Sequence, residues 1–178
     1  MDNRKVKPEK FILDATAGYR MMWFNKQHPN TIYLDERPEC EPDIIGDFRE
    51  LKQFKNETFN LIIFDPPHII ESSQTASNII RDYGCLQKET WPSLIKDGAR
   101  ELWRLLKPMG VLLFKWSNQY IPSNQVIKLF PEKPLIYQIS ANKDKYSKRK
   151  VGARNRIKNI QTLWFCFMKI PEENKKDE

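Results

Sequence analysis

The stretch Leu61-Ile62-Ile63-Phe64-Asp65-Pro66-Pro67-His68 decides how this chain is expected to fold. Its first four residues form an apolar, β-branched run with the length of a buried strand. Because proline fixes φ and lacks an N–H, Pro66 and Pro67 then hold the chain in a rigid corner. The carboxylate and carbonyl oxygens of that corner can accept hydrogen bonds from an amino group without offering it a proton.

Three further apolar runs also lead to an aspartate. They are Phe11-Ile12-Leu13 before Asp14, Thr31-Ile32-Tyr33-Leu34 before Asp35, and Ile44-Ile45 before Gly46 and Asp47. One aspartate after a strand is ordinary, because aspartate begins turns and caps helices. Four of them, spaced by about one strand-and-helix unit, favour a site, since ligands of open α/β sheets bind beyond the carboxyl ends of the strands. The sequence therefore predicts one crevice lined by four carboxylates.

The remaining chain alternates strand-like and helix-like segments, which is the pattern of a doubly wound α/β sheet. The clearest helix covers residues 93–106, where apolar residues recur on one face and Lys107-Pro108 ends the pattern. Shorter helices are expected at 19–26, 48–54 and 123–130, and later strands at 111–114, 135–139 and 162–170, the last two antiparallel. We expect one domain over residues 1–178, with a charged tail at 171–178 that frays.

The order and spacing of these segments resemble the class I S-adenosylmethionine-dependent methyltransferases. Within that family the chain is similar to the amino-methyltransferases that carry an (Asp/Asn)-Pro-Pro-aromatic motif, and the resemblance covers residues 11–170. It implies a Rossmann-like, seven-stranded sheet with the last strand antiparallel. Asp14-Ala15-Thr16-Ala17-Gly18 is similar to the family's cofactor loop, Asp35 lies where the family holds the ribose, and Asp47-Phe48 lies where it contacts adenine. The residues that the resemblance implies for S-adenosylmethionine are Asp14, Ala15, Thr16, Gly18, Asp35, Glu36, Asp47 and Phe48.

By the same resemblance, Asp65-Pro66-Pro67-His68 corresponds to the catalytic tetrapeptide. An exocyclic amine is a poor nucleophile, because its lone pair is delocalised into the ring. Hydrogen bonds to the Asp65 carboxylate and the Pro66 carbonyl would direct that lone pair toward the methyl group, which is orientation and electrostatic stabilisation. His68 would stack on the target base, which must first leave a duplex.

Two residues depart from the family pattern. Arg20 stands where the cofactor loop usually has a second glycine, and His68 stands where the tetrapeptide usually has Tyr, Phe or Trp. Imidazole offers a smaller stacking face and titrates near neutral pH. Both departures keep open a catalytically silent, methyltransferase-like subunit that binds nucleic acid.

Two segments exceed the minimal sheet. Residues 69–90 form a long polar stretch that we interpret as a substrate lid, the alternative being a plain surface insertion. Residues 143–158 carry eight basic side chains and one acidic one, so their net charge of +7 equals that of the whole chain. Such clusters bind phosphate backbones, although a solvated loop is the alternative. The residues expected to contact substrate are Tyr83, Lys115, Trp116, Lys148, Arg149, Lys150, Arg154 and Arg156, Trp116 fitting the core equally well.

Composition agrees with a cytoplasmic protein that has one core. The chain has 178 residues, of which 40% are hydrophobic, and no apolar run approaches the roughly 20 residues that span a bilayer. The charged residues 1–10 do not have the pattern of a signal peptide. Cys40, Cys85 and Cys166 have no C-x-x-C spacing and only two histidines accompany them, so we expect reduced cysteines and no metal site.

These features together predict an S-adenosylmethionine-dependent methyltransferase that acts on a nucleic-acid base, with adenine N6 in DNA or RNA preferred. A guanine- or cytosine-directed enzyme, an enzyme of the same fold that methylates a protein amide or small amine, and the silent subunit remain alternatives. A single domain also leaves room for a protein partner that supplies target specificity.

Overall fold

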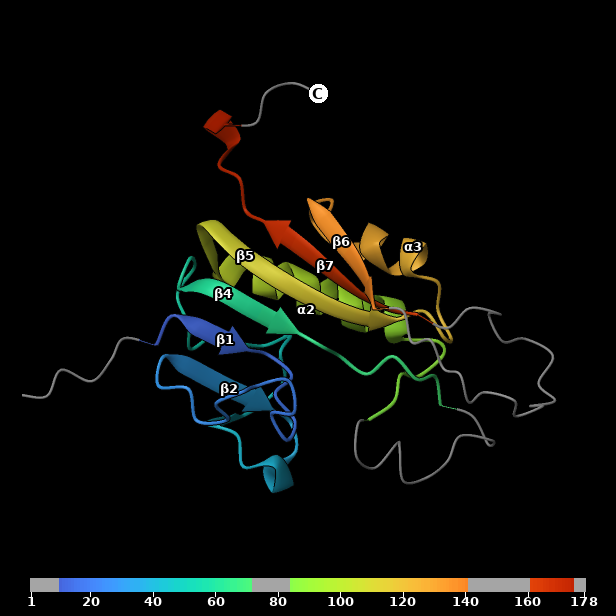
Figure 1. Ribbon diagram of the computed structural model, residues 1–178, viewed down its shortest axis with the longest axis horizontal. Coiled ribbons are helices and arrows are strands. Elements are labelled where there is room, and N and C mark those ends of the chain that lie inside the picture. Colours follow the sequence, from blue (N-terminus) through green and yellow to red (C-terminus); the bar gives the residue numbers. More distant parts are fainter. Residues whose placement is uncertain (1–9, 72–83, 141–160, 175–178) are drawn as a thin grey trace, which may run out of the picture.

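The computed structural model describes residues 10–71, 84–140 and 161–174. Within those ranges, seven strands form one sheet in the order β3-β2-β1-β4-β5-β7-β6 (Figure 1). The strands are β1 (Ile12–Asp14), β2 (Thr31–Asp35), β3 (Ile44–Ile45), β4 (Phe59–Phe64), β5 (Leu106–Ser117), β6 (Ile136–Ser140) and β7 (Thr162–Met168). β7 runs antiparallel to both of its neighbours, and the other pairings are parallel. The predicted doubly wound, seven-stranded α/β sheet is confirmed.

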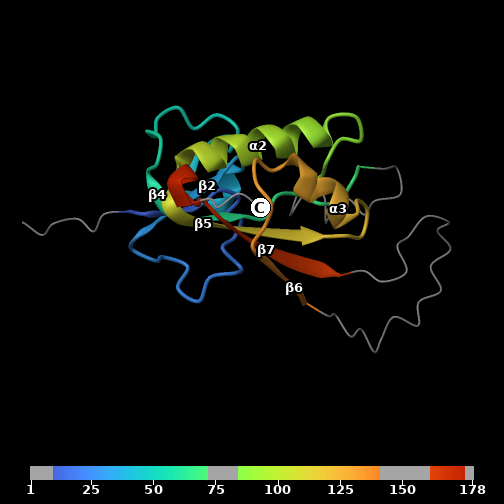
Figure 2. The same ribbon diagram turned by 90° about the horizontal axis from the view of Figure 1, so that it is seen from above.

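Helices α2 (Trp91–Leu105) and α3 (Ser123–Val126) lie over one face of the sheet, and the irregular chain that follows β1 lies over the other (Figure 2). Short 3-10 helices cover Pro38–Cys40, Ile127–Leu129 and Glu172–Asn174. α2 turns Ile95, Ala99 and Leu102 inward, and all three are fully buried. Their spacing of three and four residues is the reason this segment forms a helix on the sheet.

The helix expected over residues 93–106 therefore exists, and β5 follows it without a connecting loop. The expected strand at 111–114 is the centre of the longer β5, which pairs with β4 and β7. The central aromatic side chains of these strands, Phe64, Phe114 and Trp116, are fully buried. This packing fixes the carboxyl ends of β4 and β5, where Asp65 and Lys115 emerge.

Two expected helices are absent, so those predictions were wrong. Residues 19–26 and 48–54 form turns. Arg20 has a φ of 56°, outside the helical region, and Trp23 Nε1 donates to the buried Asp14 carboxylate at 2.7 Å. In the second segment, Glu101 of α2 accepts a hydrogen bond from the Leu51 backbone N–H, and Arg104 donates to the Leu51 carbonyl. Side chains from other elements provide hydrogen-bond partners for the backbone of these segments. Both segments are also too short to be stable as isolated helices.

The described part of the chain contains no helix that combines the length and the apolar character needed to cross a membrane. Of the segments set apart by sequence, 72–83, 143–158 and 175–178 lie outside the described residues, so the predicted lid, basic loop and frayed tail remain predictions.

Candidate active site

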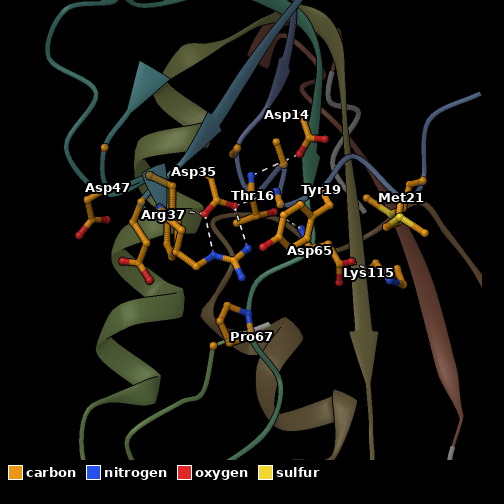
Figure 3. A pocket seen from close by; sticks show the side chains of 18 residues that line it. Asp14, Thr16, Tyr19, Met21, Asp35, Arg37, Asp47, Asp65, Pro67 and Lys115 are labelled. Carbon is orange, nitrogen blue, oxygen red and sulfur yellow. Dashed lines mark hydrogen bonds and ion pairs between the residues drawn. The ribbon is translucent and has the colours of Figure 1, made fainter. Parts of the chain in front are cut away.

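The carboxyl ends of the parallel strands open into one pocket of about 270 Å³ (Figure 3). All eight residues predicted to bind the cofactor line it, together with the predicted substrate residue Lys115 and two members of the tetrapeptide. The predicted residues that line the pocket are Asp14, Ala15, Thr16, Gly18, Asp35, Glu36, Asp47, Phe48, Asp65, Pro67 and Lys115. The four strand-end aspartates thus face one cavity, as expected from their register.

Asp14 is fully buried at the end of β1. Its carboxylate accepts hydrogen bonds from Trp23 Nε1 at 2.7 Å and from the Thr16 backbone N–H at 3.3 Å. Burial raises the pKa of Asp14 to about 6, helped by the nearby charges of Asp65 and Asp35 and opposed by the two hydrogen bonds. Within the described residues Asp14 takes part in no ion pair, so a positively charged ligand would supply the partner that this carboxylate lacks.

Asp35 is held by hydrogen bonds on both oxygens. Oδ1 accepts from the backbone N–H and Nε of Arg37, at 3.0 and 2.9 Å, and Oδ2 accepts from the Gly18 N–H at 2.7 Å and from Arg37 Nη2 at 3.2 Å. Burial works against ionisation, but these hydrogen bonds outweigh it and hold the pKa of Asp35 below its usual value. A carboxylate has about four acceptor positions, so a further donor can bind Asp35 only where Arg37 withdraws.

Asp47 repeats this arrangement after β3. The Arg49 side chain and backbone N–H bind its carboxylate, and hydrogen bonding from Arg49 lowers the pKa of Asp47. The neighbouring Phe48 ring packs edge-on against Phe64, with ring centroids 5.0 Å apart. Phe48 therefore offers the pocket a fixed aromatic wall.

Asp65 connects the cofactor loop to β5. Its backbone N–H donates to Thr16 Oγ1 at 2.7 Å, which ties the proline corner to the loop after β1. Lys115 Nζ donates to Asp65 Oδ2 at 2.6 Å, and both side chains are partly exposed. Within the described residues Asp65 Oδ1 accepts no hydrogen bond, so lysine holds one carboxylate oxygen and the other is available to a donor.

Of the predicted site residues that the structure describes, three do not line the pocket. Pro66 is buried, and its role is the backbone corner itself. His68 packs edge-on toward Trp116 at 6.2 Å, and burial, aided by Lys115, lowers the pKa of His68 although Asp65 opposes this effect. Trp116 is fully buried and donates from Nε1 to the Ile121 carbonyl at 3.0 Å. Trp116 is therefore a core residue, which corrects its assignment to substrate.

The departure at Arg20 has a structural explanation. Its guanidinium points away from the pocket, donating to the carbonyls of Lys26 at 2.8 Å and Glu41 at 2.7 Å, and lies 4.1 Å from the centre of the Tyr33 ring. A non-glycine residue pays a conformational cost at a φ of 56°. The three contacts offset that cost and hold the cofactor loop in place.

Sequence reasoning missed several residues that line the pocket, namely Ala17, Tyr19, Met21, Met22, Arg37, Gly46 and Gly84. The pattern Asp-x-Arg, which occurs in Asp35-Glu36-Arg37 and again in Asp47-Phe48-Arg49, was a signal for the arginine partners. No comparable pattern marked Tyr19 or Met21. The predicted substrate residues Tyr83, Lys148, Arg149, Lys150, Arg154 and Arg156 lie outside the described residues.

Among the residues that the structure describes, no group of three or more His, Cys, Asp or Glu side chains could hold a metal ion. The described cysteines are free thiols, with Cys40 buried and Cys85 and Cys166 partly buried.

Comparison with known proteins supports the fold. No protein-family model matches this chain, and no curated protein matches it in sequence. TrmN from Thermus thermophilus is similar in structure, with a TM-score of 0.54 and 14% identity over 90% of this chain and 44% of TrmN. An rRNA methylase from Streptococcus thermophilus gives a TM-score of 0.51 and 10% identity over 92% of this chain and 89% of that protein. The chain shares their fold. It spans less than half the length of TrmN.

Proposed function

We propose that this chain is an S-adenosylmethionine-dependent methyltransferase that acts on an exocyclic amino group of a nucleic-acid base, with adenine N6 as the preferred target. One observation carries the proposal: the loop after β1, the strand-end carboxylates, and Asp65 and Pro67 of the proline corner line one pocket. The same fold occurs in a protein described as an rRNA methylase, which supports a nucleic-acid substrate.

The residues of the pocket suit this cofactor. When bound, S-adenosylmethionine supplies an electrophilic methyl group on a cationic sulfur, and it also carries an ammonium group. Asp14 offers a buried carboxylate without an ion-pair partner among the described residues, and a cation would favour its ionised form. Phe48 offers an aromatic face for the adenine, and Glu36 is an exposed carboxylate beside the saturated Asp35.

Asp65 would orient the attacking amine. Lys115 fixes Oδ2 of Asp65, so Oδ1 is left to accept a hydrogen bond from the amine. The Pro66 carbonyl already accepts a hydrogen bond from His68, and its second lone pair would accept the other amine hydrogen. These acceptors localise the lone pair of the amine and stabilise the positive charge that develops on nitrogen as the methyl group arrives. Because the Thr16 hydroxyl binds the Asp65 backbone, the corner and the cofactor loop keep a constant separation.

A test with labelled S-adenosylmethionine and separate pools of DNA, RNA and protein decides between substrate classes. We expect transfer to a nucleic-acid pool, with the label on a methylated adenosine after nucleoside digestion. Asp65→Ala should lower the rate by about 100-fold or more while cofactor affinity stays close to that of the wild type. Asp97→Ala, which removes an exposed carboxylate on α2, is the matched control. Transfer to the protein pool alone, or more than a few per cent of activity in Asp65→Ala, contradicts the proposal.

A second candidate is a methyltransferase-like subunit that binds nucleic acid without catalysis. The saturated acceptors of Asp35 and the inward position of His68 favour it. Calorimetry separates the two candidates, because a silent subunit of this kind binds no S-adenosylmethionine and transfers label to none of the three pools.

A further inference from the structure

Three apolar side chains stand exposed on the loop that follows β1, beside the pocket. Tyr19 is 49% exposed, Met21 is 73% exposed and Phe24 is fully exposed. Tyr19 and Met21 also line the pocket that contains Asp65 and Lys115 (Figure 3). We call Tyr19, Met21 and Phe24 the apolar rim. Tyr19 and Met21 continue the wall of the pocket into solvent, and Phe24 follows them on the same loop.

The loop behind the apolar rim is fixed. Trp23 donates to buried Asp14 at 2.7 Å and packs edge-on against Tyr33 with ring centroids 5.2 Å apart. Arg20 donates to two backbone carbonyls, and its guanidinium lies over the Tyr33 ring, 4.1 Å from the ring centre. Arg20 and Trp23 thus anchor the loop while Met21 and Phe24, between and after them, point outward. A held surface of this kind loses little entropy when a ligand binds.

We propose that the apolar rim stacks on an unpaired base of the nucleic-acid substrate, next to the nucleotide whose amine enters the pocket. This inference rests on the proposed function. Methionine and aromatic side chains offer soft, flat contacts that any base can use. His68, which was expected to stack on the target base, packs against Trp116 and does not line the pocket, so stacking on the neighbouring base would help to hold the substrate at this site.

A cation on the same edge favours nucleic acid over a protein partner. Lys26 Nζ lies 3.5 Å from Met21 Sδ, which places an exposed ammonium group beside the rim where a phosphate would follow the stacked base. Stable protein–protein interfaces bury about 800 Å² on each partner. Three side chains on one loop are a small patch for that purpose, but they match the size of one or two bases.

The experiment measures binding of fluorescently labelled single-stranded DNA and RNA oligonucleotides by anisotropy at several salt concentrations. Phe24→Ala and Met21→Ala should each weaken binding by about 5- to 100-fold, the range for loss of one stacked base. Phe24→Trp should bind as well as the wild type. Salt dependence should stay unchanged in Phe24→Ala, whereas Lys26→Ala should flatten the slope by about 0.7. Ile136→Ala on β6 is the matched control, since Ile136 is 68% exposed and lies outside the pocket.

Cofactor affinity is the second measurement, and it should be unchanged in Phe24→Ala because Phe24 does not line the pocket. Wild-type binding that Phe24→Ala and Met21→Ala both retain overturns the stacking inference and leaves the proposed function standing. Loss of binding to a protein partner, with oligonucleotide binding intact, overturns it as well. A wild-type protein that transfers methyl groups to no nucleic acid contradicts the proposed function instead.

Discussion

Each of the four strand-end aspartates has a different environment, although the sequence presents them alike. Asp35 and Asp47 are bound by the arginine two residues later, and Asp65 is bound by Lys115 on the neighbouring strand. Asp14 is buried against Trp23. These partners therefore set the chemistry of the pocket. Sequence reasoning named none of them as a partner, and it assigned Lys115 to the substrate.

Stability should depend on pH through Asp14. Its pKa is about 6 in the folded protein, above the ordinary 3.8, so the folded state binds this proton more tightly than the unfolded state. The contribution of Asp14 to stability therefore rises as the pH falls from above 6 toward 4. Asp14→Asn should raise the free energy of unfolding at pH 7.5 by on the order of 2 kcal/mol, after loss of a hydrogen bond to Trp23 is subtracted. The gain should shrink as the pH is lowered.

Chemical denaturation of both proteins at pH 7.5, 6 and 4.5 measures this difference. Asp35, Asp43, Asp47 and Glu101, whose pKa values are lowered, lose stabilisation as the pH falls, but they are present in both proteins. Asp97→Asn is the control for an exposed carboxylate. A gain that is independent of pH would show that Asp14 does not titrate near 6.

Arg37 and Asp35 should differ in their effect on the cofactor. Asp35→Ala removes the acceptor of the Gly18 N–H and should weaken S-adenosylmethionine binding by about 1–3 kcal/mol. Arg37→Ala frees the acceptor positions on Asp35 that the Arg37 side chain fills, so affinity should stay the same or increase. Calorimetry of S-adenosylmethionine binding to both variants measures this difference. Arg49→Ala makes the corresponding change in the second Asp-x-Arg pair, Asp47 and Arg49, and serves for comparison. An equal loss in Arg37→Ala and Asp35→Ala would mean that Arg37 itself holds the cofactor or its loop.

At the scale of elements, α2 supports the pocket from outside it. Gly98 in its middle is buried, and a Cβ built there would lie 2.4 Å from Phe48 Cε2. Arg104 at its last turn reaches the carbonyls of Leu51 and Phe54. The helix thus positions the irregular segment that carries the aromatic wall.

Gly98→Ala should therefore be destabilising, although the same change at an exposed helix position gains about 1 kcal/mol. Phe48 is held by Phe64, so the added methyl group must push the ring toward the pocket at a cost of about 1–3 kcal/mol. Denaturation and cofactor calorimetry should both show a loss. Ser93→Ala on the exposed side of α2 should show neither, and Gly98→Ala combined with Phe48→Leu should recover stability. A more stable Gly98→Ala protein would contradict the packing.

Strands were predictable here, whereas only one of the three short helices expected is present, at 123–130, as α3 followed by the 3-10 helix Ile127–Leu129. β1, β2, β3 and β4 coincide with apolar runs, because a buried strand carries its own signal in four or five residues. Residues 19–26 and 48–54 were predicted as helices from their position between strands. Their real conformation depends on Asp14, Glu41, Glu101 and Arg104, which are distant in sequence. The site residues at strand ends could be predicted because the strands could be. Tyr19 and Met21 could not be placed at the pocket, because residues 19–26 were predicted as a helix.

For the whole molecule, charge is unevenly distributed along the chain. The net charge of +7 equals that of residues 143–158, which lie outside the described residues, so the rest of the chain is neutral in sum. Within the described pocket, three of the four strand-end carboxylates are already paired with cations. Attraction to a polyanion should therefore come mainly from the basic segment.

Replacement of Lys148, Arg149 and Lys150 by alanine should flatten the salt dependence of nucleic-acid binding by roughly two to three units, since each neutralised phosphate contributes about 0.7 to 0.9. Cofactor affinity should not change. Binding to DNA and RNA at several salt concentrations measures the slope, with Lys88, Lys96 and Arg100 replaced together as an equal change in charge elsewhere. Equal slopes for the two triple variants would place the phosphate contacts outside 143–158.

The pairing of Ile70 with Leu86 has a consequence for engineering this protein. The Glu71 N–H donates to the Leu86 carbonyl at 2.9 Å, and the Leu86 N–H donates to the Ile69 carbonyl at 2.7 Å, so the two ends of the intervening segment are fastened together. We therefore expect that residues 72–83 can be exchanged for a short glycine-serine linker, or for a graft of another length, without loss of the described sheet. If such a chimera keeps its melting temperature and cofactor affinity but prefers another oligonucleotide, residues 72–83 determine the target. Target preference could then be changed without altering the cofactor site.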